Sequence, residues 1–221
     1  MYLWPILALF AASFEAVIVW KKLIKFEVFA KPAVMLFLFL WLYAITGLQG
    51  DTLWFGIGIL LSLVGDVLLM SFTNRMFVLG LAAFLFAHIA YIIGFKEELL
   101  NPTAWSFILL FLLFVNGIRL IRRIVGAMRA MQQNALVLPV IVYSLVISLM
   151  LFAAMSTIFD PAWNTGAAFF VSLGAFLFYL SDLILAWNKF VSPVKNGPVL
   201  NIVAYHLGQI SLIAGVISQF G

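Results

Sequence analysis

Two aspartates lie inside long apolar segments of the sequence. Asp66 stands in SLVGDVLLM and Asp182 in FYLSDLILAW, and neither segment holds another charged residue. A charged side chain at the centre of a bilayer costs about 2.5 to 3.5 kcal/mol on insertion scales, so such residues usually pair or mark a functional site. Two carboxyl groups in one dry cavity can act as acid and base, because desolvation and mutual repulsion leave one protonated and one ionised. Asp66 and Asp182 are therefore candidate catalytic residues.

Other polar residues recur at helical spacing in the same segments. Residues three or four positions apart share one face of a helix. One such stripe is Gly80, Phe84, His88, Tyr91 and Phe95, a second is Tyr205, Gln209 and Leu212, and a third is Gly58, Ser62 and Asp66. Small residues beside a carboxylate allow close helix contact. The spacing predicts that these polar stripes face the interior of a helix bundle.

The composition places these residues in a membrane. Of the 221 residues, 66% are hydrophobic and 9% are charged, against about 45 to 50% and about 25% in soluble domains. The chain contains no cysteine, which excludes a disulfide framework, a thiol nucleophile and a thiolate metal site. With two histidines, a classical zinc site is not expected. The sequence implies no metal and no organic cofactor.

Eight apolar stretches approach the roughly 20 residues that a helix needs to cross a bilayer. They are residues 2–20, 32–48, 53–72, 76–95, 103–118, 136–155, 166–188 and 199–219. The sequence thus predicts an all-α, polytopic membrane bundle of eight transmembrane helices, forming a single transmembrane domain over residues 1–221. The basic segment 119–129 predicts an amphipathic helix that faces lipid headgroups.

Lysine and arginine are divided unequally between the two sides of this bundle. The connections after spans one, three, five and seven hold eleven of these residues, and the other side holds only Lys96. Since cytoplasmic connections carry the excess, both termini are predicted to be non-cytoplasmic. The basic side then faces anionic headgroups, so the net charge of +4 requires no nucleic-acid partner. The helix rise places Asp66, Asp182 and Tyr205 about 9 Å in from the cytoplasmic edge.

Each of these residues can also have a purely structural role. The aspartates can simply form hydrogen bonds between helices, and His88, Tyr91 and Tyr205 can be packing residues. Glu15, near the membrane edge, is expected to snorkel toward the headgroups. The segments around the two aspartates also resemble each other, which predicts that spans three and four repeat as spans seven and eight. Such copies would be related by an axis along the membrane normal.

The chain resembles the YhhN family of integral membrane proteins, whose animal members include lysoplasmalogenases. The resemblance covers nearly the whole chain, in order: Lys31-Pro32; Ser62, Gly65-Asp66 and Leu69; Phe77, Gly80-Leu81, Phe84, His88, Tyr91 and Phe95; Tyr143 and Met150; Gly174-Ala175, Phe178, Ser181-Asp182, Leu185-Ala186 and Phe190; Tyr205 with Gln209. One departure is Gly208, where the family pattern has alanine. Glu15 is not part of the pattern, so no role is transferred to it.

The resemblance implies hydrolysis of the vinyl ether bond of lysoplasmalogens, giving a fatty aldehyde and glycerophosphoethanolamine or glycerophosphocholine. A vinyl ether yields to acid: a proton reaches the β-carbon, water attacks the resulting oxocarbenium ion, and the hemiacetal collapses. This chemistry needs a carboxylic acid and a carboxylate, as glycoside hydrolysis does. Asp66 and Asp182 are the expected pair, with their assignment to acid and base left open.

The remaining candidate residues are expected to bind or orient the substrate. Lys31 would hold the phosphate as a point charge at the cytoplasmic mouth of the site. The others would orient water and the leaving glycerol oxygen; they are His88, Tyr91, Ser181, Tyr205 and Gln209. The expected partners are a lysophospholipid substrate and membrane lipids.

Two other classes of function fit the same residues. Intramembrane Asp, His and Tyr side chains also suit a proton-coupled carrier of a small amphiphile, and a non-catalytic lipid binder is a third possibility. A carrier predicts ligand flux into sealed vesicles, whereas an enzyme predicts aldehyde release in detergent. The short loops and the absence of cysteine fit a bacterial inner membrane. In a membrane without vinyl ether lipids, another ether or ester lysolipid becomes the expected substrate.

Overall fold

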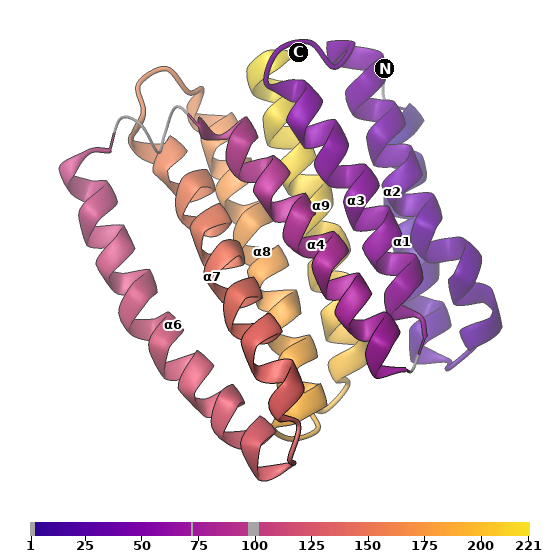
Figure 1. The fold of residues 1–221 in the computed structure, drawn as a ribbon. Coiled ribbons are helices and arrows are strands. Elements are labelled where there is room, and N and C mark those ends of the chain that lie inside the picture. The colour runs from indigo at the N-terminus through magenta and orange to yellow at the C-terminus, as the bar shows by residue number, and fades with distance from the viewer. Residues whose placement is uncertain (1–2, 72, 97–101) are drawn as a thin grey trace.

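The computed structural model describes residues 3–71, 73–96 and 102–221, and the regular secondary structure within them is all helical (Figure 1). Eight of the described helices are long and apolar enough to cross a membrane, which confirms the predicted bundle. They are α1 (Leu3–Trp20), α2 (Ile24–Thr46), α3 (Thr52–Leu69), α4 (Asn74–Gly94), α6 (Ala104–Ala130), α7 (Asn134–Ser156), α8 (Thr165–Phe190) and α9 (Gly197–Phe220), with a 3-10 turn, η1 (Thr157–Phe159), after α7. The chain is an integral membrane protein.

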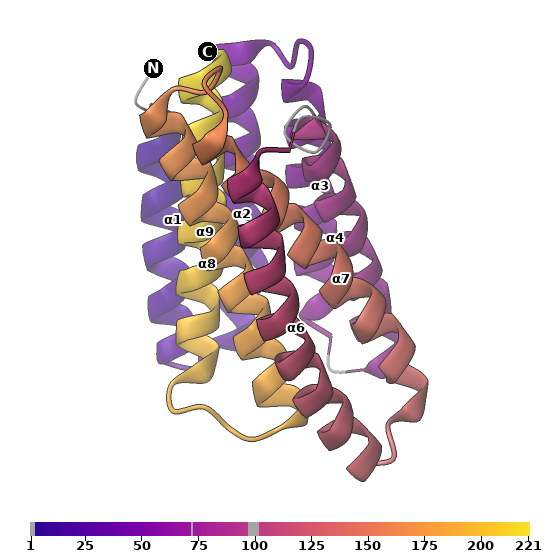
Figure 2. The same cartoon turned by 90° about the vertical axis from the view of Figure 1, so that its left-hand side faces the viewer.

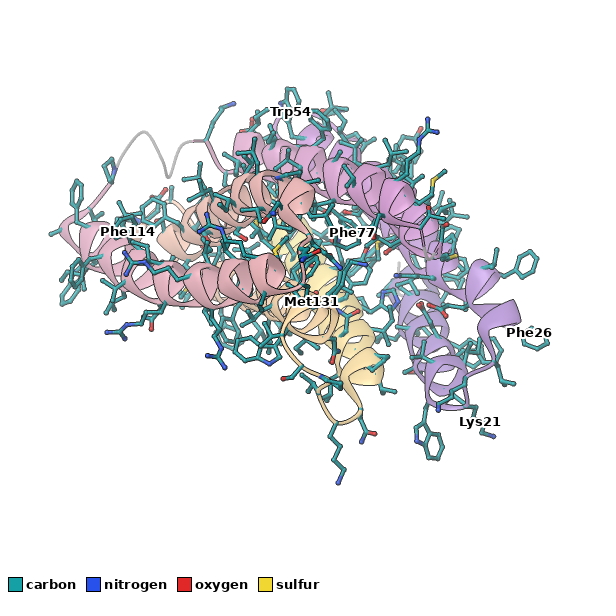
Figure 3. The ribbon with its side chains drawn as sticks, turned by 60° about the horizontal axis from the view of Figure 1, so that its bottom comes forward. Lys21, Phe26, Trp54, Phe77, Phe114 and Met131 are labelled. Carbon is teal, nitrogen blue, oxygen red and sulfur yellow. The ribbon has the colours of Figure 1, made fainter. Side chains whose placement is uncertain are left out.

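Both ends of the chain lie at the same end of the bundle, as eight spans require (Figure 1). The opposite end holds the α1–α2, α3–α4, α6–α7 and α8–α9 connections, and we call it the basic end because Lys21, Lys22 and Lys195 lie there. Figure 3 looks toward this end. Which side of the membrane it faces stays a prediction from the distribution of charge.

Helix α2 begins earlier than the sequence predicted. Its first residue is Ile24 rather than residue 32, so Lys31 lies within the helix instead of in a loop. The chain turns between α1 and α2 just before this point, where Lys22 adopts a left-handed conformation with φ of 57°. Pro32 is accommodated inside α2. The earlier start places Lys31 on α2 rather than in a connection, and its side chain is 12% exposed.

Helix α6 continues through the basic segment that follows its predicted span. Ile124, Val125 and Met128 are buried on one face of this extension, whereas Arg122 and Arg129 are exposed. The predicted amphipathic character of residues 119–129 is therefore confirmed, within one continuous helix. Upstream, large apolar side chains such as Phe111 and Phe114 are exposed on α6, which lies at the edge of the bundle (Figures 1 and 2). An apolar outer surface is what a lipid-facing helix presents.

Helix α9 lies at the centre of the arrangement and packs against α1, α2, α3 and α8. Its contact with α8 is backbone on backbone at three glycines, Gly174 on α8 and Gly208 and Gly215 on α9. A Cβ on Gly174 would lie 2.4 Å from the backbone nitrogen of Leu212, and one on Gly208 would lie 2.8 Å from that of Phe178. Small residues of this kind let transmembrane helices approach closely. The departure at Gly208 from the family pattern therefore coincides with a contact that has no room for alanine.

The polar stripes face the interior, as their spacing predicted. His88, Tyr91, Asp66, Tyr205 and Gln209 are each at most 4% exposed. A further close approach supports them, because a Cβ on Gly58 would clash with the ring of Tyr91. Helices α3 and α4 therefore meet tightly on the face that carries Asp66.

Candidate functional site

Asp66 forms the centre of a polar cluster between α2, α3 and α9. Its Oδ2 accepts a hydrogen bond of 2.7 Å from the Tyr205 hydroxyl, and its Oδ1 lies 3.3 Å from Nζ of Lys31. The side chain of Asp66 is 1% exposed and that of Lys31 is 12% exposed. A carboxylate buried in a membrane protein needs a compensating charge and hydrogen-bond donors, and these two partners supply both. We call these three residues the Asp66 cluster.

A second set of hydrogen bonds links the predicted polar stripes beside this cluster. The Tyr91 hydroxyl donates to Oε1 of Gln209 at 2.9 Å, and Nε2 of Gln209 donates to the Ser62 hydroxyl at 3.1 Å. All three side chains are buried. The chain of bonds joins α3, α4 and α9, and it fixes the position of the helices that carry Asp66 and Tyr205.

Glu15 and His206 form a buried pair beside the Asp66 cluster. Nε2 of His206 lies 2.5 Å from Oε2 of Glu15, and the two side chains are 1% and 0% exposed. His206 packs against Tyr205 of that cluster, with ring centroids 5.0 Å apart. The expectation that Glu15 snorkels toward the headgroups is therefore wrong: a histidine on α9, facing α1, provides a partner in the interior, so the carboxyl group has no need to reach the membrane surface.

Asp182 belongs to a different cluster, formed by α4, α7 and α8. Its Oδ2 accepts a short hydrogen bond from the Tyr143 hydroxyl, which in turn lies 3.0 Å from Nε2 of His88. Because the single tyrosine proton is directed to the carboxylate, Nε2 of His88 is the donor in the second bond. Ser181 lies 3.5 Å from Oδ1 of Asp182 and also donates to the backbone oxygen of Phe178. We call Asp182, Tyr143 and His88 the Asp182 cluster.

Aromatic rings lie between the two clusters. Phe178 packs against Tyr205 of one cluster with ring centroids 5.2 Å apart, and against His88 of the other at 4.7 Å. Phe84 contacts both Phe178 and Tyr205 edge-on. Among the described residues, no hydrogen bond or ion pair joins Asp66 to Asp182. The two carboxylates thus belong to separate clusters that share contacts with Phe178, rather than to a contacting pair.

A large cavity opens beside the Asp66 cluster at the basic end of the bundle. Its volume is about 870 Å³, and Lys31 lies in its wall. Residues from α1, α2 and the ends of α3, α8 and α9 complete the lining. Ligand sites of small molecules usually enclose about 300 to 1,000 Å³. The cavity therefore offers enough space for the polar end of a lipid, directly beside the lysine that holds Asp66.

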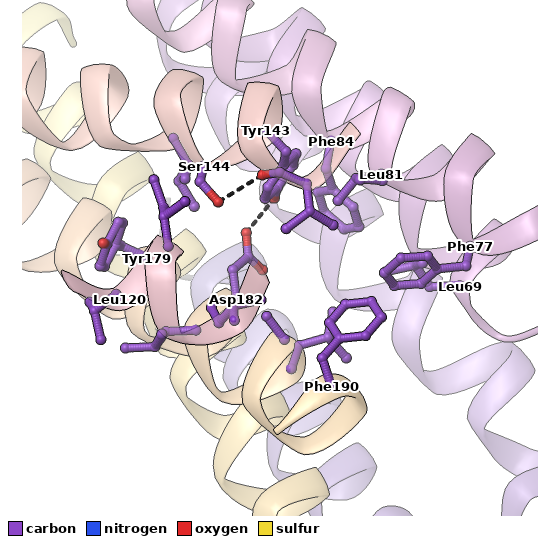
Figure 4. Close-up of a pocket in the computed structure, with 17 residues that line it drawn as sticks. Leu69, Phe77, Leu81, Phe84, Leu120, Tyr143, Ser144, Tyr179, Asp182 and Phe190 are labelled. Carbon is purple, nitrogen blue, oxygen red and sulfur yellow. Dashed lines mark hydrogen bonds between the residues drawn. The ribbon is translucent and has the colours of Figure 1, made fainter. Parts of the chain in front are cut away.

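A smaller apolar pocket of about 70 Å³ adjoins the Asp182 cluster (Figure 4). Asp182 and Tyr143 point toward each other in this pocket, and Phe77, Phe84, Leu120 and Phe190 surround them. Leu69 and Leu185 line both this pocket and the large cavity. The two spaces are therefore adjacent, one on the side of Lys31 and the other on the side of Asp182.

The structure groups the candidate residues in a way the sequence did not predict. It brings Lys31 and Tyr205 to Asp66, and His88 to Asp182, while Tyr91 and Gln209 bond to each other. It also adds three polar residues to which the sequence analysis gave no role: Glu15, His206 and Tyr143. Glu15 and His206 carried a usable signal, since ionisable residues within spans are rare and usually functional. No group of three or more His, Cys, Asp or Glu side chains in the described part of the chain is placed to hold a metal ion.

The chain is similar to known proteins over most of its length. The profile of the YhhN family matches residues 26–216. Lysoplasmalogenase TMEM86B of Mus musculus is 29% identical over 203 residues, covering 86% of this chain and 74% of the relative. The Homo sapiens protein of that name is 29% identical over 179 residues, covering 81% and 69%. The Sus scrofa protein is 30% identical over 161 residues, covering 73% and 62%. No solved structure matches the chain.

Proposed function

Because this chain belongs to the YhhN family, we propose that it is a hydrolase that cleaves the vinyl ether bond of a lysoplasmalogen within the membrane. The observation that carries the proposal is the Asp66 carboxylate, which is bound by Tyr205 and by Lys31, a residue in the wall of a cavity large enough for the polar end of a lipid. Relatives named lysoplasmalogenase align over most of the chain, which supports the same activity here.

The proposed substrate position follows from the two adjacent spaces. A lysolipid has a single chain, so its headgroup can occupy the large cavity while the chain passes Leu69 and Leu185 toward the small pocket. The vinyl ether bond joins the headgroup end to the chain. In this arrangement it lies between Lys31, which holds Asp66, and the pocket that contains Asp182.

The partners of the two carboxylates suggest different roles. Lys31 balances the charge of an ionised Asp66, which suits a base that activates water and stabilises a developing cation. Asp182 has no lysine or arginine partner among the described residues and instead ends a chain of hydrogen bonds from Tyr143 and His88. This environment suits the acid, because the proton can be replaced along that chain. We therefore assign Asp182 as the proton donor and Asp66 as the base.

The proposed reaction consumes one water and restores both carboxyl groups. Asp182 gives its proton to the β-carbon, and water attacks the α-carbon while Asp66 takes a proton from that water. The hemiacetal then collapses: its hydroxyl proton returns to Asp182, and Asp66 gives its proton to the leaving glycerol oxygen. The products are a fatty aldehyde and a glycerophospho-headgroup. Inverting glycosidases place two carboxyl groups about 6.5 to 9.5 Å apart to leave room for water, so the aspartates need not touch.

The test is aldehyde release by the purified protein in detergent. A 1-alkenyl lysophosphoethanolamine should yield aldehyde, and the saturated 1-alkyl analogue should yield none. In D2O the aldehyde should carry one deuterium on the carbon next to the carbonyl, because the proton delivered to the β-carbon then comes from the solvent. Free aldehyde incubated in D2O serves as the control for exchange after release. Asp66→Asn and Asp182→Asn should each release aldehyde about 10³-fold more slowly although folded. The matched control is Asp51→Asn, which removes another lysine-paired carboxylate, 2.6 Å from Lys96 at the other end of the bundle.

A different outcome would identify another function. Absence of aldehyde from the parent protein, together with flux of lysolipid into sealed vesicles, would favour a proton-coupled carrier instead. The bacterial inner membrane stays a prediction from the sequence, and the relatives compared are mammalian.

A further inference from the structure

The large cavity is lined by an unusual combination of charges for a site inside a lipid-facing bundle. Among the residues whose side chains the structure describes, its charged lining residues are Lys22, Glu27 and Lys31, two cations and one anion. Glu27 and Lys31 lie one turn apart on the same face of α2 and interact electrostatically. Glu27 is not needed to neutralise Lys31, because Asp66 already does so at 3.3 Å. The carboxylate of Glu27 therefore remains available to a ligand in the cavity.

We propose that this cavity is a headgroup site for a lysolipid that carries phosphate and a primary ammonium, that is, an ethanolamine headgroup rather than a choline headgroup. Lys22 and Lys31 bind the phosphate, and Glu27 accepts hydrogen bonds from the ammonium. The inference rests on the proposed function for the identity of the lipid, and it adds which headgroup the protein selects.

Charge complementarity supports this assignment. A phosphoethanolamine group has one negative phosphate and one positive ammonium joined by a short carbon bridge, and the cavity presents the opposite charges on adjacent turns of α2. The ammonium of Lys31 has three donors, so it can contact the phosphate while it remains paired with Asp66. This contact also places the glycerol oxygen of the lipid next to the Asp66 cluster.

Hydrogen-bonding chemistry supports ethanolamine over choline. A primary ammonium donates to a carboxylate, and such charge-assisted bonds are stronger than neutral ones. A quaternary ammonium has no N–H group and is instead recognised by cages of aromatic rings. Trp20 is the single aromatic residue among those described in the lining, and it is 67% exposed. The cavity thus contains a carboxylate for an ammonium and lacks an aromatic cage for a choline.

The test measures binding of lipids that have no vinyl ether bond, so the protein cannot cleave them. Saturated 1-alkyl lysolipids with ethanolamine or choline headgroups displace a fluorescent 1-alkyl lysolipid from the purified protein at fixed detergent concentration. We expect the ethanolamine lipid to bind about tenfold more tightly, the effect of one charge-assisted hydrogen bond in a partly buried site. Glu27→Gln should reduce this ratio to about twofold or less by weakening the ethanolamine lipid alone. Asp160→Asn, which removes a carboxylate at the other end of the bundle, should leave the ratio unchanged.

A series of headgroups tests the same inference without any variant. Adding one, two and three methyl groups to the ethanolamine nitrogen should weaken binding to the parent protein stepwise, as N–H donors are lost. Equal or tighter binding of the choline lipid would overturn the inference, and so would an unchanged ratio in folded Glu27→Gln. Because the readout is binding, a preference for ethanolamine without aldehyde release would leave this inference standing and count only against the hydrolase. Aldehyde release without a preference for the ethanolamine lipid would support the hydrolase and overturn this inference.

Discussion

The Asp66 cluster and the Asp182 cluster contain the same acidic side chain in different electrostatic surroundings. Asp66 is 1% exposed and has a lysine against one oxygen and a tyrosine against the other. Asp182 is 18% exposed and has a tyrosine and a histidine, without a lysine or arginine among the described residues. The first lies beside a large cavity with charged walls, and the second lies in a small apolar pocket. Residue type and depth alone therefore do not determine what each carboxyl group does.

Each aspartate is paired with a residue on the helix that follows the helix of the other aspartate. Asp66 on α3 bonds to Tyr205 on α9, which is the helix after the one that carries Asp182. Asp182 on α8 lies 3.8 Å from His88 on α4, which is the helix after the one that carries Asp66. An internal repeat of α3–α4 as α8–α9 would produce this pairing, so the arrangement supports the repeat, which stays a prediction. Divergence of two copies would explain why similar positions hold different partners.

The largest expected effect comes from removing both carboxylates. Asp66→Asn and Asp182→Asn should each lower kcat by about 10³-fold, within the range for general acid–base groups. If both act on one bond, the double variant should be little worse than either single variant, because groups that act as a unit have non-additive effects. Aldehyde release under saturating lysolipid measures all three rates. Multiplicative losses would mean that the clusters act independently, and the acid and base assignment would then fail.

The next largest effect is on the stability of the protein, which the two substitutions should lower by different amounts. Asp66→Asn leaves the buried ammonium of Lys31 without its partner, and breaking a buried ion pair costs about 3 to 5 kcal/mol. Asp182→Asn should cost less, because Asp182 is more exposed and no lysine depends on it. Thermal unfolding in one detergent compares the two variants.

A double variant tests the cause of that loss. Lys31→Met combined with Asp66→Asn removes both charges, so it should recover most of the stability that Asp66→Asn lost, while aldehyde release stays as slow as in Asp66→Asn. Recovered stability without recovered activity would show that the low activity of Asp66→Asn is not a folding defect. If the double variant were as unstable as Asp66→Asn, the stability contrast between the clusters would have another origin.

Much of this arrangement was predictable from spacing and charge. Helical periodicity placed His88, Tyr91, Tyr205 and Gln209 in the interior, because a polar residue in a span is costly unless it faces protein. The apolar stretches predicted the correct number of spans, and the excess of Lys and Arg on alternate connections agreed with that number. These are local or additive properties of the chain, and a single sequence contains them.

The pairing of residues was not predictable in the same way. Lys31 was predicted to lie in the connection before a span over residues 32–48, whereas α2 begins at Ile24 and carries Lys31 to Asp66. Glu15 appeared to lie near the membrane edge, and its partner His206 comes from the far end of the sequence. Partners across the bundle depend on how the helices pack, and periodicity within one helix carries no information about that packing.

The two tyrosines give a smaller contrast. Tyr143→Phe removes the donor to Asp182 and leaves Nε2 of His88 without its acceptor, so two bonds of the proton chain are lost. Tyr205→Phe removes one donor from Asp66, which keeps Lys31. We expect kcat to fall about 100-fold for Tyr143→Phe and about 10-fold for Tyr205→Phe, toward the lower end of acid–base effects. Equal losses, or the reverse order, would contradict the assignment of the proton donor to the Asp182 cluster.

The smallest expected effect comes from the contact that fixes the clusters relative to each other. Helix α8 carries Asp182 and α9 carries Tyr205, and the two helices touch at Gly174 and Gly208. Gly208→Ala would place a Cβ 2.8 Å from the Phe178 backbone, so α8 and α9 must separate slightly, and overpacking of this kind costs about 1 to 3 kcal/mol. Gly126→Ala on α6 is the matched control, because nothing lies within 4 Å of its added Cβ. That control should be neutral or stabilising, since alanine favours a helix over glycine.

The kinetic result of Gly208→Ala then tests whether the geometry between the clusters matters. Separation of α8 from α9 moves Tyr205 and Asp182 apart without changing any polar group, so kcat should fall a few-fold while the affinity for the saturated 1-alkyl lysolipid stays near that of the parent protein. Lowered stability with unchanged kcat would mean that the distance between the clusters does not limit the reaction. In that case one cluster would carry the chemistry alone, and the non-additivity expected for the two aspartates would have to be absent as well.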